Sequence, residues 1–241
     1  MLIDVQCLPV PPAPNHLSNR AVVVLDVLRA TSVMVYALSE GAKEIIPTRT
    51  VEEAFQMAKA FPPNSTLLGG EMKSSKIEGF DLGNSPKEYG AGKVKGKRLI
   101  LATTNGTKAF HLISSAQHIL VGSFFNIGAT AQRCLELNKD LLIFPSGDDG
   151  NFSLEDAVCG GMLIDMVMKK KKIDIVLTDA SHSAYILYQK FEANLVEAFH
   201  LSRHGKELIN LGEGNDLPFC GQVDITDIVP IYKNGVIGAS S

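Results

Sequence analysis

Short apolar runs alternate with amphipathic segments along most of the chain, and this alternation restricts its fold more than any other feature. The runs have the length of strands, and the segments between them have helical spacing and polar capping residues. Alternating strands and helices predict parallel strands joined by right-handed crossovers, with helices on both faces of the sheet. We therefore expect an α/β fold, a three-layer α/β/α sandwich with a largely parallel sheet. The predicted strands are Leu2–Val5, Ala21–Leu25, Glu44–Pro47, Thr66–Gly69, Arg98–Ala102, His118–Val121 and Asp140–Phe144, and the predicted helices cover residues 31–41, 51–61, 106–115 and 126–137.

The alternation stops at about Ile173, where three helical patterns follow one another before a predicted hairpin whose turn is Asn234-Gly235. The three patterns lie at residues 179–191, 192–202 and 204–212. No linker, low-complexity stretch or repeat separates this part from the rest of the chain. We therefore expect a single domain over residues 1–241, in which residues 173–241 form a helical elaboration and a terminal hairpin.

Composition excludes several classes of protein. The chain has 241 residues, of which 45% are hydrophobic and 20% charged, enough for a sizeable core. Its net charge of −3 argues against a nucleic-acid partner, because phosphates attract a basic surface. No apolar stretch approaches the roughly 20 residues that span a bilayer, and no secretory signal is visible. The four cysteines lack the spacing of a zinc site or a disulfide scaffold, so we expect a cytoplasmic protein.

Polar residues follow the predicted strands at the points where the strands end. Asp26 and Glu71 each follow an apolar run, and the polar segments 103–107 and 146–156 follow two more. In open α/β sheets, ligands bind in the crevice beyond the carboxyl ends of the strands. The positions of these side chains therefore predict that they share one site.

The carboxylates of this predicted site suit a magnesium ion. Asp26, Glu71 and one or both of Glu155 and Asp156 would provide hard oxygen ligands, which Mg²⁺ prefers. A helix-capping role is also open for the segment that begins at Ser153, since its S-L-E-D sequence resembles a capping box. Glu71 has no such alternative, because it directly follows Leu-Leu-Gly-Gly.

An anion could bind next to these carboxylates. Residues 104–107 join a strand to a helix, so they present backbone N–H groups, and Gly106 would allow close approach. A plain turn with a Thr or Asn cap explains the same residues equally well. Arg29 could fork onto a phosphate or carboxylate, or it could simply pair with Asp26, which is the simpler explanation. Carboxylates for a metal and donors for an anion together indicate chemistry on a phosphate ester.

Five motifs occur in one order between about Leu25 and the C-terminal tail: DVLRATS, GFDLGNSPKEY, TTNGTKA, FSLEDAVCGG and SRHGKELINLG. Together they resemble the 2-phosphosulfolactate phosphatase family. The resemblance implies an α/β/α sandwich and a Mg²⁺-dependent phosphatase. Such enzymes release phosphate from 2-phospho-3-sulfolactate to give 3-sulfolactate, a step towards coenzyme M. The family is also associated with phosphate esters of other 2-hydroxy acids, so the expected partner is a small phosphorylated 2-hydroxy acid.

The resemblance assigns roles to individual residues. The expected catalytic residues are Asp26, Arg29, Glu71 and Asp156. The expected Mg²⁺ ligands are Asp26, Glu71, Glu155 and Asp156. The expected substrate-binding residues are Arg29, Thr31, Ser32, Asn84, Ser85, Thr104, Asn105, Gly106 and Thr107. We expect Asp26 to be chiefly a metal ligand, with water rather than Asp26 attacking phosphorus.

The chain departs from the family pattern at two places. Met72 stands where the resemblance leads us to expect an arginine, and the segment 146–153 carries acids where a basic residue is expected. If those cations grip the sulfonate, this protein prefers another 2-phospho acid. The remaining candidate cations for a sulfonate are Arg20, Lys73, Lys76 and Lys108.

Other functions compete with this one. A haloacid-dehalogenase-type phosphatase needs a second Asp two residues after the first, and that position is Leu28. An isochorismatase-like hydrolase could use Asp26, Lys108 and Cys159, although Cys159 has the apolar neighbours of a buried residue. A non-enzymatic anion-binding module is the third alternative. His204 could reach the site from a C-terminal helix, and a homodimer is compatible with the sequence.

Overall fold

The computed structural model describes residues 1–170 and 174–239, so Ile173, where the elaboration was predicted to begin, lies outside the described residues. Its strands are β1 (Leu2–Val5), β2 (Arg20–Leu25), β3 (Glu44–Thr48), β4 (Thr66–Met72), β5 (Ser75–Lys76), β6 (Arg98–Ala102), β7 (His118–Gly122), β8 (Asp140–Pro145), β9 (Val176–Leu177), β10 (Pro230–Lys233) and β11 (Val236–Ala239). Its α-helices are α1 (Pro14–Leu17), α2 (Ala30–Ser39), α3 (Val51–Ala58), α4 (Ala91–Val94), α5 (Gly106–Leu112), α6 (Ile127–Leu137), α7 (Leu154–Lys170), α8 (Asp179–Phe191), α9 (Leu195–Leu201), α10 (Arg203–Asn210) and α11 (Asp216–Cys220).

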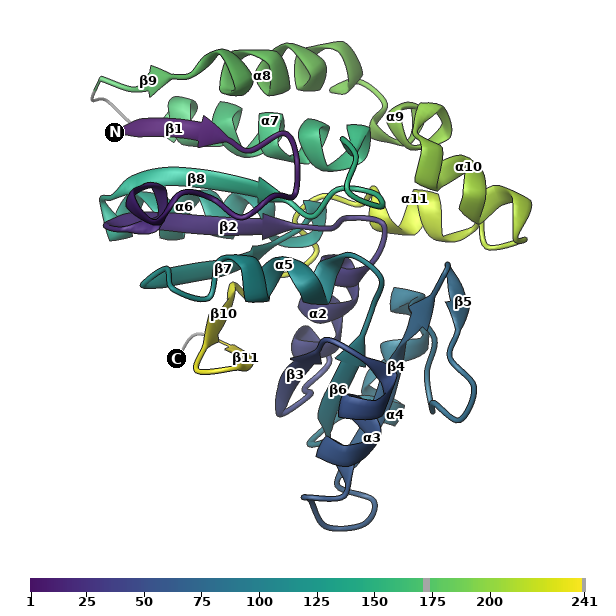
Figure 1. The fold of residues 1–241 in the computed structure, drawn as a ribbon. Helices are drawn as coiled ribbons and strands as arrows, with labels where there is room; N and C mark the ends of the chain where they lie inside the picture. The colour runs from purple at the N-terminus through teal and green to yellow at the C-terminus, as the bar shows by residue number, and fades with distance from the viewer. Residues whose placement is uncertain (171–173, 240–241) are drawn as a thin grey trace.

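The described strands form one sheet in the order β5-β4-β6-β3-β11-β10-β7-β2-β8-β1-β9 (Figure 1). Every predicted strand is present, and the strands that alternate with helices pair in parallel, as in β2 with β7 and β8. The sheet is strongly bent, so that β4 and β6 run in a different direction from β2 and β8 (Figure 1). As a result, the carboxyl ends of β2 and β8 approach those of β4 and β6, although four strands separate the two pairs.

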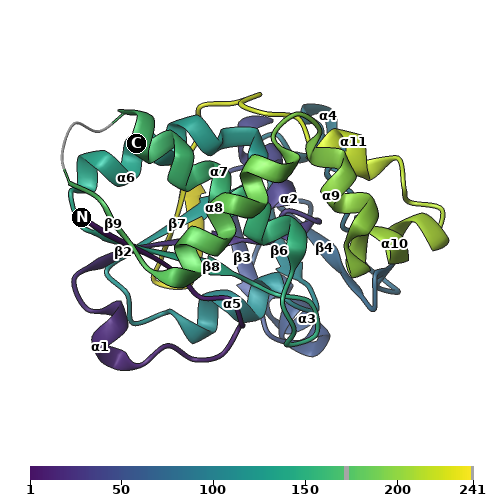
Figure 2. The same ribbon diagram turned by 90° about the horizontal axis from the view of Figure 1, so that it is seen from above.

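The two faces of β2 belong to two different hydrophobic cores. Val23 and Leu25 pack with apolar side chains of α6, α7 and α8, whereas Val22 and Val24 pack with those of α2 and α5. Figure 2 shows α6 and α7 on one side of the strands and α5 on the other. Because successive side chains of a strand point to opposite faces, a strand buried on both faces is apolar throughout. The three-layer α/β/α prediction is therefore confirmed.

The predicted C-terminal hairpin is also present, but it lies in the middle of the sheet. Its strands β10 and β11 pair antiparallel with β7 and β3, respectively. Asn234 and Gly235 have φ angles of 52° and 83°, the left-handed values that a two-residue hairpin turn needs. The hairpin thereby joins the two differently directed parts of the sheet.

Candidate active site

Asp26 directly follows β2 and begins a tightly bonded loop. Its carboxylate is 8% exposed and accepts a hydrogen bond from the N–H of Ala30 at 3.2 Å. Its own N–H donates to the Thr31 hydroxyl at 3.0 Å, and the Ser32 hydroxyl donates to the Val27 carbonyl at 2.8 Å. The hydroxyls of Thr31 and Ser32, which were predicted to bind substrate, thus hold the loop that presents Asp26.

Glu155 and Asp156 lie in the first turn of α7, and both are buried. The Asp156 carboxylate accepts a hydrogen bond from the Val27 N–H at 2.9 Å, which brings it against the Asp26 loop. The Asp156 N–H donates to the Ser153 hydroxyl at 3.3 Å. Ser153 therefore caps the start of α7, and Asp156 lies against the loop that follows β2.

Glu71 is held by the segment that follows β6. Its Oε1 accepts from the Thr104 N–H at 2.7 Å, and its Oε2 accepts from the Thr104 hydroxyl at 3.0 Å and the Ser74 N–H at 2.7 Å. Glu71 was expected after its strand, but β4 continues to Met72 because it pairs with β5 across a tight turn. The carboxylate nevertheless points to the same end of the sheet.

Gly69 and Gly70, the two glycines before Glu71, allow other parts of the protein to approach the backbone of β4 closely. A Cβ atom added at Gly70 would overlap the Ala102 carbonyl of β6, and one at Gly69 would overlap the Tyr89 hydroxyl. The partner that approaches is therefore the protein itself.

The segment 103–107 connects Glu71 to Asp26. Gly106 begins α5, and a Cβ atom there would lie 2.7 Å from Asp26 Oδ2. The Thr107 N–H donates to the Thr103 hydroxyl at 3.0 Å, and Thr107 is fully buried. The N–H groups of residues 104 and 107 are thus already used inside the protein, in contrast to the predicted open cradle.

Arg29 takes part in a separate, buried network. It is 2% exposed, and its ion pairs with described residues are to Asp216 at 2.8 Å and to Glu213, not to Asp26. The Ser85 hydroxyl donates to the same Asp216 carboxylate at 2.8 Å. Arg29 Nε and Asn84 Oδ1 are also buried, and neither has a hydrogen-bond partner among the described residues. The sequence did not predict Glu213 or Asp216.

The carboxylates form one electrostatic cluster. Burial raises the pKa of Asp26 and Glu155, and it raises that of Asp156 well above its usual range. The charges of Asp26 and Glu155 add to the effect on Asp156, and Glu71 adds to that on Asp26. The charge of His204, on α10, opposes it by lowering the pKa of Asp26 and Glu155. A cation bound here would relieve this repulsion.

The carboxylate oxygens of this cluster are the type of ligand that Mg²⁺ prefers, but they are not arranged as a complete metal site. Within residues 1–170 and 174–239, no three His, Cys, Asp or Glu side chains are gathered closely enough to hold a metal ion alone. Mg²⁺ does not require such a cage, because it usually takes one or two carboxylates and completes its shell with water and phosphate oxygens. Asp26 and Asp156 could provide these two carboxylates, because the residue after Asp26, Val27, donates its N–H to Asp156.

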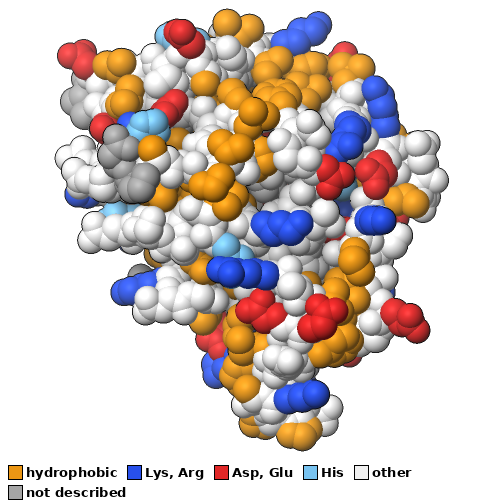
Figure 3. Space-filling view, in the orientation of Figure 1, with side chains coloured by type: hydrophobic (Ala, Val, Ile, Leu, Met, Phe, Trp, Pro, Cys, Tyr) orange, Lys and Arg blue, Asp and Glu red, His pale blue; other side chains and the backbone are white. Residues whose placement is uncertain are grey.

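A cavity of about 420 Å³, called the carboxylate cavity below, opens beside Glu71. Its lining residues are Glu71, Met72, Lys73, Ser74, Thr104, Asn105, Asp148, Asp149, His204 and Glu207. Arg203 bonds Asp148 at 2.5 Å and ties the loop after β8 to α10. Acidic and basic side chains stand side by side on the face drawn in Figure 3.

Two further polar residues from the segments predicted to reach the site lie close to the cavity or to Asp26. His204 lines it, as its sequence position suggested. Ser146, the first residue of the polar segment predicted to reach the site, has its hydroxyl close enough to Asp26 to lower the pKa of that carboxyl. It is buried without a good hydrogen-bond partner among the described residues. Its place directly after β8 is the signal on which that prediction rested.

Residues 9–235 match the family model described as 2-phosphosulpholactate phosphatase. The chain belongs to this family. It is 43% identical over 226 residues to a protein of Caldanaerobacter subterraneus named probable 2-phosphosulfolactate phosphatase, with 94% of this chain and 93% of the relative aligned. A Clostridium acetobutylicum protein of the same name is 42% identical over 223 residues, covering 92% and 94% of the two chains.

The structure speaks against the isochorismatase-like and haloacid-dehalogenase-type alternatives, in agreement with membership of the 2-phosphosulpholactate phosphatase family. Cys159 is fully buried in the core, and burial raises the pKa of its thiol well above the usual value, so it cannot serve as an exposed nucleophile. Leu28 is buried among apolar side chains. None of the described helices has the length and apolar character needed to cross a membrane.

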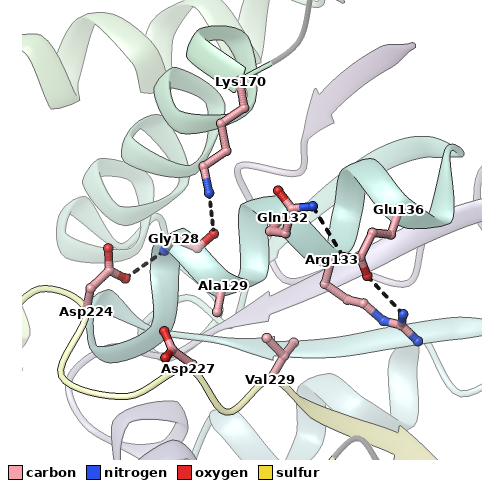
Figure 4. A pocket seen from close by; sticks show the side chains of 9 residues that line it. All are labelled: Gly128, Ala129, Gln132, Arg133, Glu136, Lys170, Asp224, Asp227 and Val229. Carbon is pink, nitrogen blue, oxygen red and sulfur yellow. Dashed lines mark hydrogen bonds and ion pairs between the residues drawn. The ribbon is translucent and has the colours of Figure 1, made fainter.

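A second cavity, of about 560 Å³, lies between α6, the end of α7 and the segment before β10 (Figure 4). Several of its polar groups bond one another, as Lys170 does with the Gly128 carbonyl and Arg133 with Glu136. It shares no lining residue with the carboxylate cavity.

Proposed function

We propose that this protein is a Mg²⁺-dependent phosphatase that hydrolyses the phosphate monoester of 2-phospho-3-sulfolactate, or of a closely related 2-hydroxy acid. The observation that carries the proposal is the meeting of the Asp26, Glu71, Glu155 and Asp156 carboxylates at one end of the sheet, in a chain of this family. The products would be phosphate and 3-sulfolactate, which fits a step towards coenzyme M.

Asp26 and Asp156 are the residues best placed to hold Mg²⁺, with Glu71 and Glu155 beside them. When bound, the ion supplies positive charge that offsets the charge of the phosphoryl oxygens. Without a cation, these carboxylates would repel a phosphate ester, and this favours a metal-dependent enzyme over a simple anion-binding module.

The substrate phosphate would lie against the start of α5. The N–H groups of Asn105 and Gly106 have no hydrogen-bond partner among the described residues, unlike those of Thr104 and Thr107. We assign Arg29 to positioning the loop after Asp26 rather than to binding phosphate, because its guanidinium group already forms ion pairs with Asp216 and Glu213.

Water, rather than Asp26, is proposed to attack phosphorus. A nucleophilic carboxylate needs a nearby acid to protonate the leaving alcohol. The position that supplies this acid in haloacid-dehalogenase-type enzymes is the buried Leu28.

Phosphate release from 2-phospho-3-sulfolactate and 2-phospholactate, with and without EDTA, tests the function. We expect release that EDTA abolishes and added Mg²⁺ restores. Full activity in EDTA would contradict the metal assignment, and no release from either ester would contradict the function. In ¹⁸O-water with enzyme in excess, the first turnover should label phosphate, whereas label in the Asp26 carboxylate would make Asp26 the nucleophile. Cys159→Ser serves as a control and should retain activity.

A further inference from the structure

The tight turn between β4 and β5 places a lysine at the carboxylate cavity. The turn residues are Lys73 and Ser74, whose φ angles are 51° and 60°. These are left-handed values, which glycine or asparagine adopts most easily in such turns. Strained backbone positions concentrate at functional sites, so a lysine here points to a use for its side chain.

Three hydrogen bonds fix this turn against the site. The Lys73 N–H donates to the Thr104 hydroxyl at 3.3 Å, and the Ser74 N–H donates to Glu71 at 2.7 Å. The Ser74 hydroxyl donates to Glu207 of α10 at 2.8 Å. The backbone of Lys73 is therefore held beside Glu71, while its side chain is exposed along the cavity.

Lys73 is the one lysine or arginine among the described residues that line this cavity, and it forms no ion pair with any described residue. The acidic lining residues Asp148 and Asp149 are already paired with Arg203. An unpaired ammonium at a cavity that also holds acidic groups is available for an anionic part of a ligand.

None of the other three candidate cations for a sulfonate lines this cavity. Arg20 pairs with Asp4, and it lies at the start of β2, away from the carboxyl end. Lys76 donates to the Asp81 carbonyl at 2.8 Å. Lys108 lines two neighbouring cavities, one of which also contains Glu71, but it does not line the cavity beside Lys73. Met72, at the position where a family arginine was expected, lines the cavity without a charge.

We propose that Lys73 binds the sulfonate of the substrate and sets the preference for a sulfonated over an unsulfonated 2-phospho acid. This role rests on the proposed function, because it assumes that the phosphate occupies the carboxylate end of the cavity. A sulfonate remains ionised at neutral pH, and in so small a substrate it stays close to the phosphate. A charged donor next to Glu71 therefore lies where the sulfonate must go.

Lys73→Asn is the variant that tests the role, because asparagine tolerates the left-handed turn while the ammonium group and its long side chain are removed. We expect kcat/KM for 2-phospho-3-sulfolactate to fall about tenfold or more, as loss of a charge-assisted hydrogen bond predicts. The value for 2-phospholactate should change by less than about threefold, and Lys73→Arg should keep the wild-type preference. Binding of the product 3-sulfolactate, measured by calorimetry, should weaken in parallel with the first value.

Lys76→Asn is the matched control, since it removes the same charge from the neighbouring strand and should leave both values unchanged. If Lys73→Asn lowered kcat/KM equally for both substrates, or left the ratio of the two kcat/KM values unchanged, the role of Lys73 would be overturned but the proposed function would not. Absence of phosphate release by the wild type would instead overturn the proposed function.

Discussion

Asp156 carries its carboxylate inside the protein, beside Asp26 and Glu155. Because burial and these neighbours raise its pKa, the folded state binds this proton more tightly than the unfolded chain does. The bound proton therefore stabilises the folded state fully below the ordinary carboxyl pKa of about 4. This stabilisation is lost as the pH rises towards the raised pKa of Asp156. At neutral pH, Asp156 therefore costs the fold stability, as expected for a residue in the role that we propose for it.

Asp156→Asn should therefore stabilise the protein while abolishing its activity. Asparagine keeps the oxygen that accepts from the Val27 N–H and removes the charge. We expect the melting temperature without divalent cations to rise by a few degrees at pH 7, and phosphatase activity to fall about a hundredfold or more. The gain should grow between pH 4 and pH 8 in thermal unfolding scans. A gain that shrinks with rising pH would contradict the assignment.

Single residues also mark the limit of prediction from the sequence. Asp26, Glu71 and Asp156 could be predicted because each lies at the end of a strand or the start of a helix, where the chain itself marks the edge of the sheet. The partners of Arg29 could not be, since Glu213 and Asp216 lie 184 and 187 positions away. No local pattern records such a contact.

At the scale of elements, β4 depends on a glycine for its distance from β6. Gly70 has a φ angle of 136°, and an added Cβ would overlap the Ala102 carbonyl. Gly70→Ala should force the strands apart and displace Glu71. We expect the free energy of unfolding to fall by about 2 kcal/mol or more, together with most of the activity.

Gly92→Ala is the matched control for that variant. Gly92 lies in α4, and no atom lies within 4 Å of an added Cβ. Alanine there should leave activity unchanged and stability equal or slightly higher. Urea unfolding and phosphate release measured on both variants check the prediction, and equal stability in the two would contradict it.

The elements hardest to predict were very short ones. The longer strands and helices carry enough residues to show a period of two or 3.6 residues. The two-residue strands β5 and β9 and the five-residue α11 carry too few, and they went unpredicted. The extension of β4 through Met72 was missed for a related reason, because it depends on pairing with β5.

For the whole molecule, the β10–β11 hairpin holds the two parts of the sheet together. Gly235 has a φ angle of 83° with open space around it, so Gly235→Val introduces backbone strain and little else. We expect a loss of about 1–2 kcal/mol in the free energy of unfolding. For a chain of this size, that lowers the melting temperature by about 2–4 °C per kcal/mol.

Gly238→Ala tests the same hairpin without that strain, since Gly238 also has open space and lies in β11. It should unfold within about a degree of the wild type. If Gly235→Val and Gly238→Ala had the same melting temperature, the conformation of the turn would not be important for holding the two parts of the sheet together. A shift of the single main transition, rather than loss of one part of it, is expected for Gly235→Val because both β3 and β7 pair with this hairpin.

The central position of β10 and β11 also has a consequence for how the chain is made. A ribosome synthesises β3 and β7 long before it reaches residues 230–239, so both strands must wait for the hairpin that lies between them. Until then, each has one edge without a partner, and such edges can pair with other chains. The sheet can therefore close only after residues 230–239 have been synthesised, and before that point the open edges of β3 and β7 expose the nascent chain to aggregation.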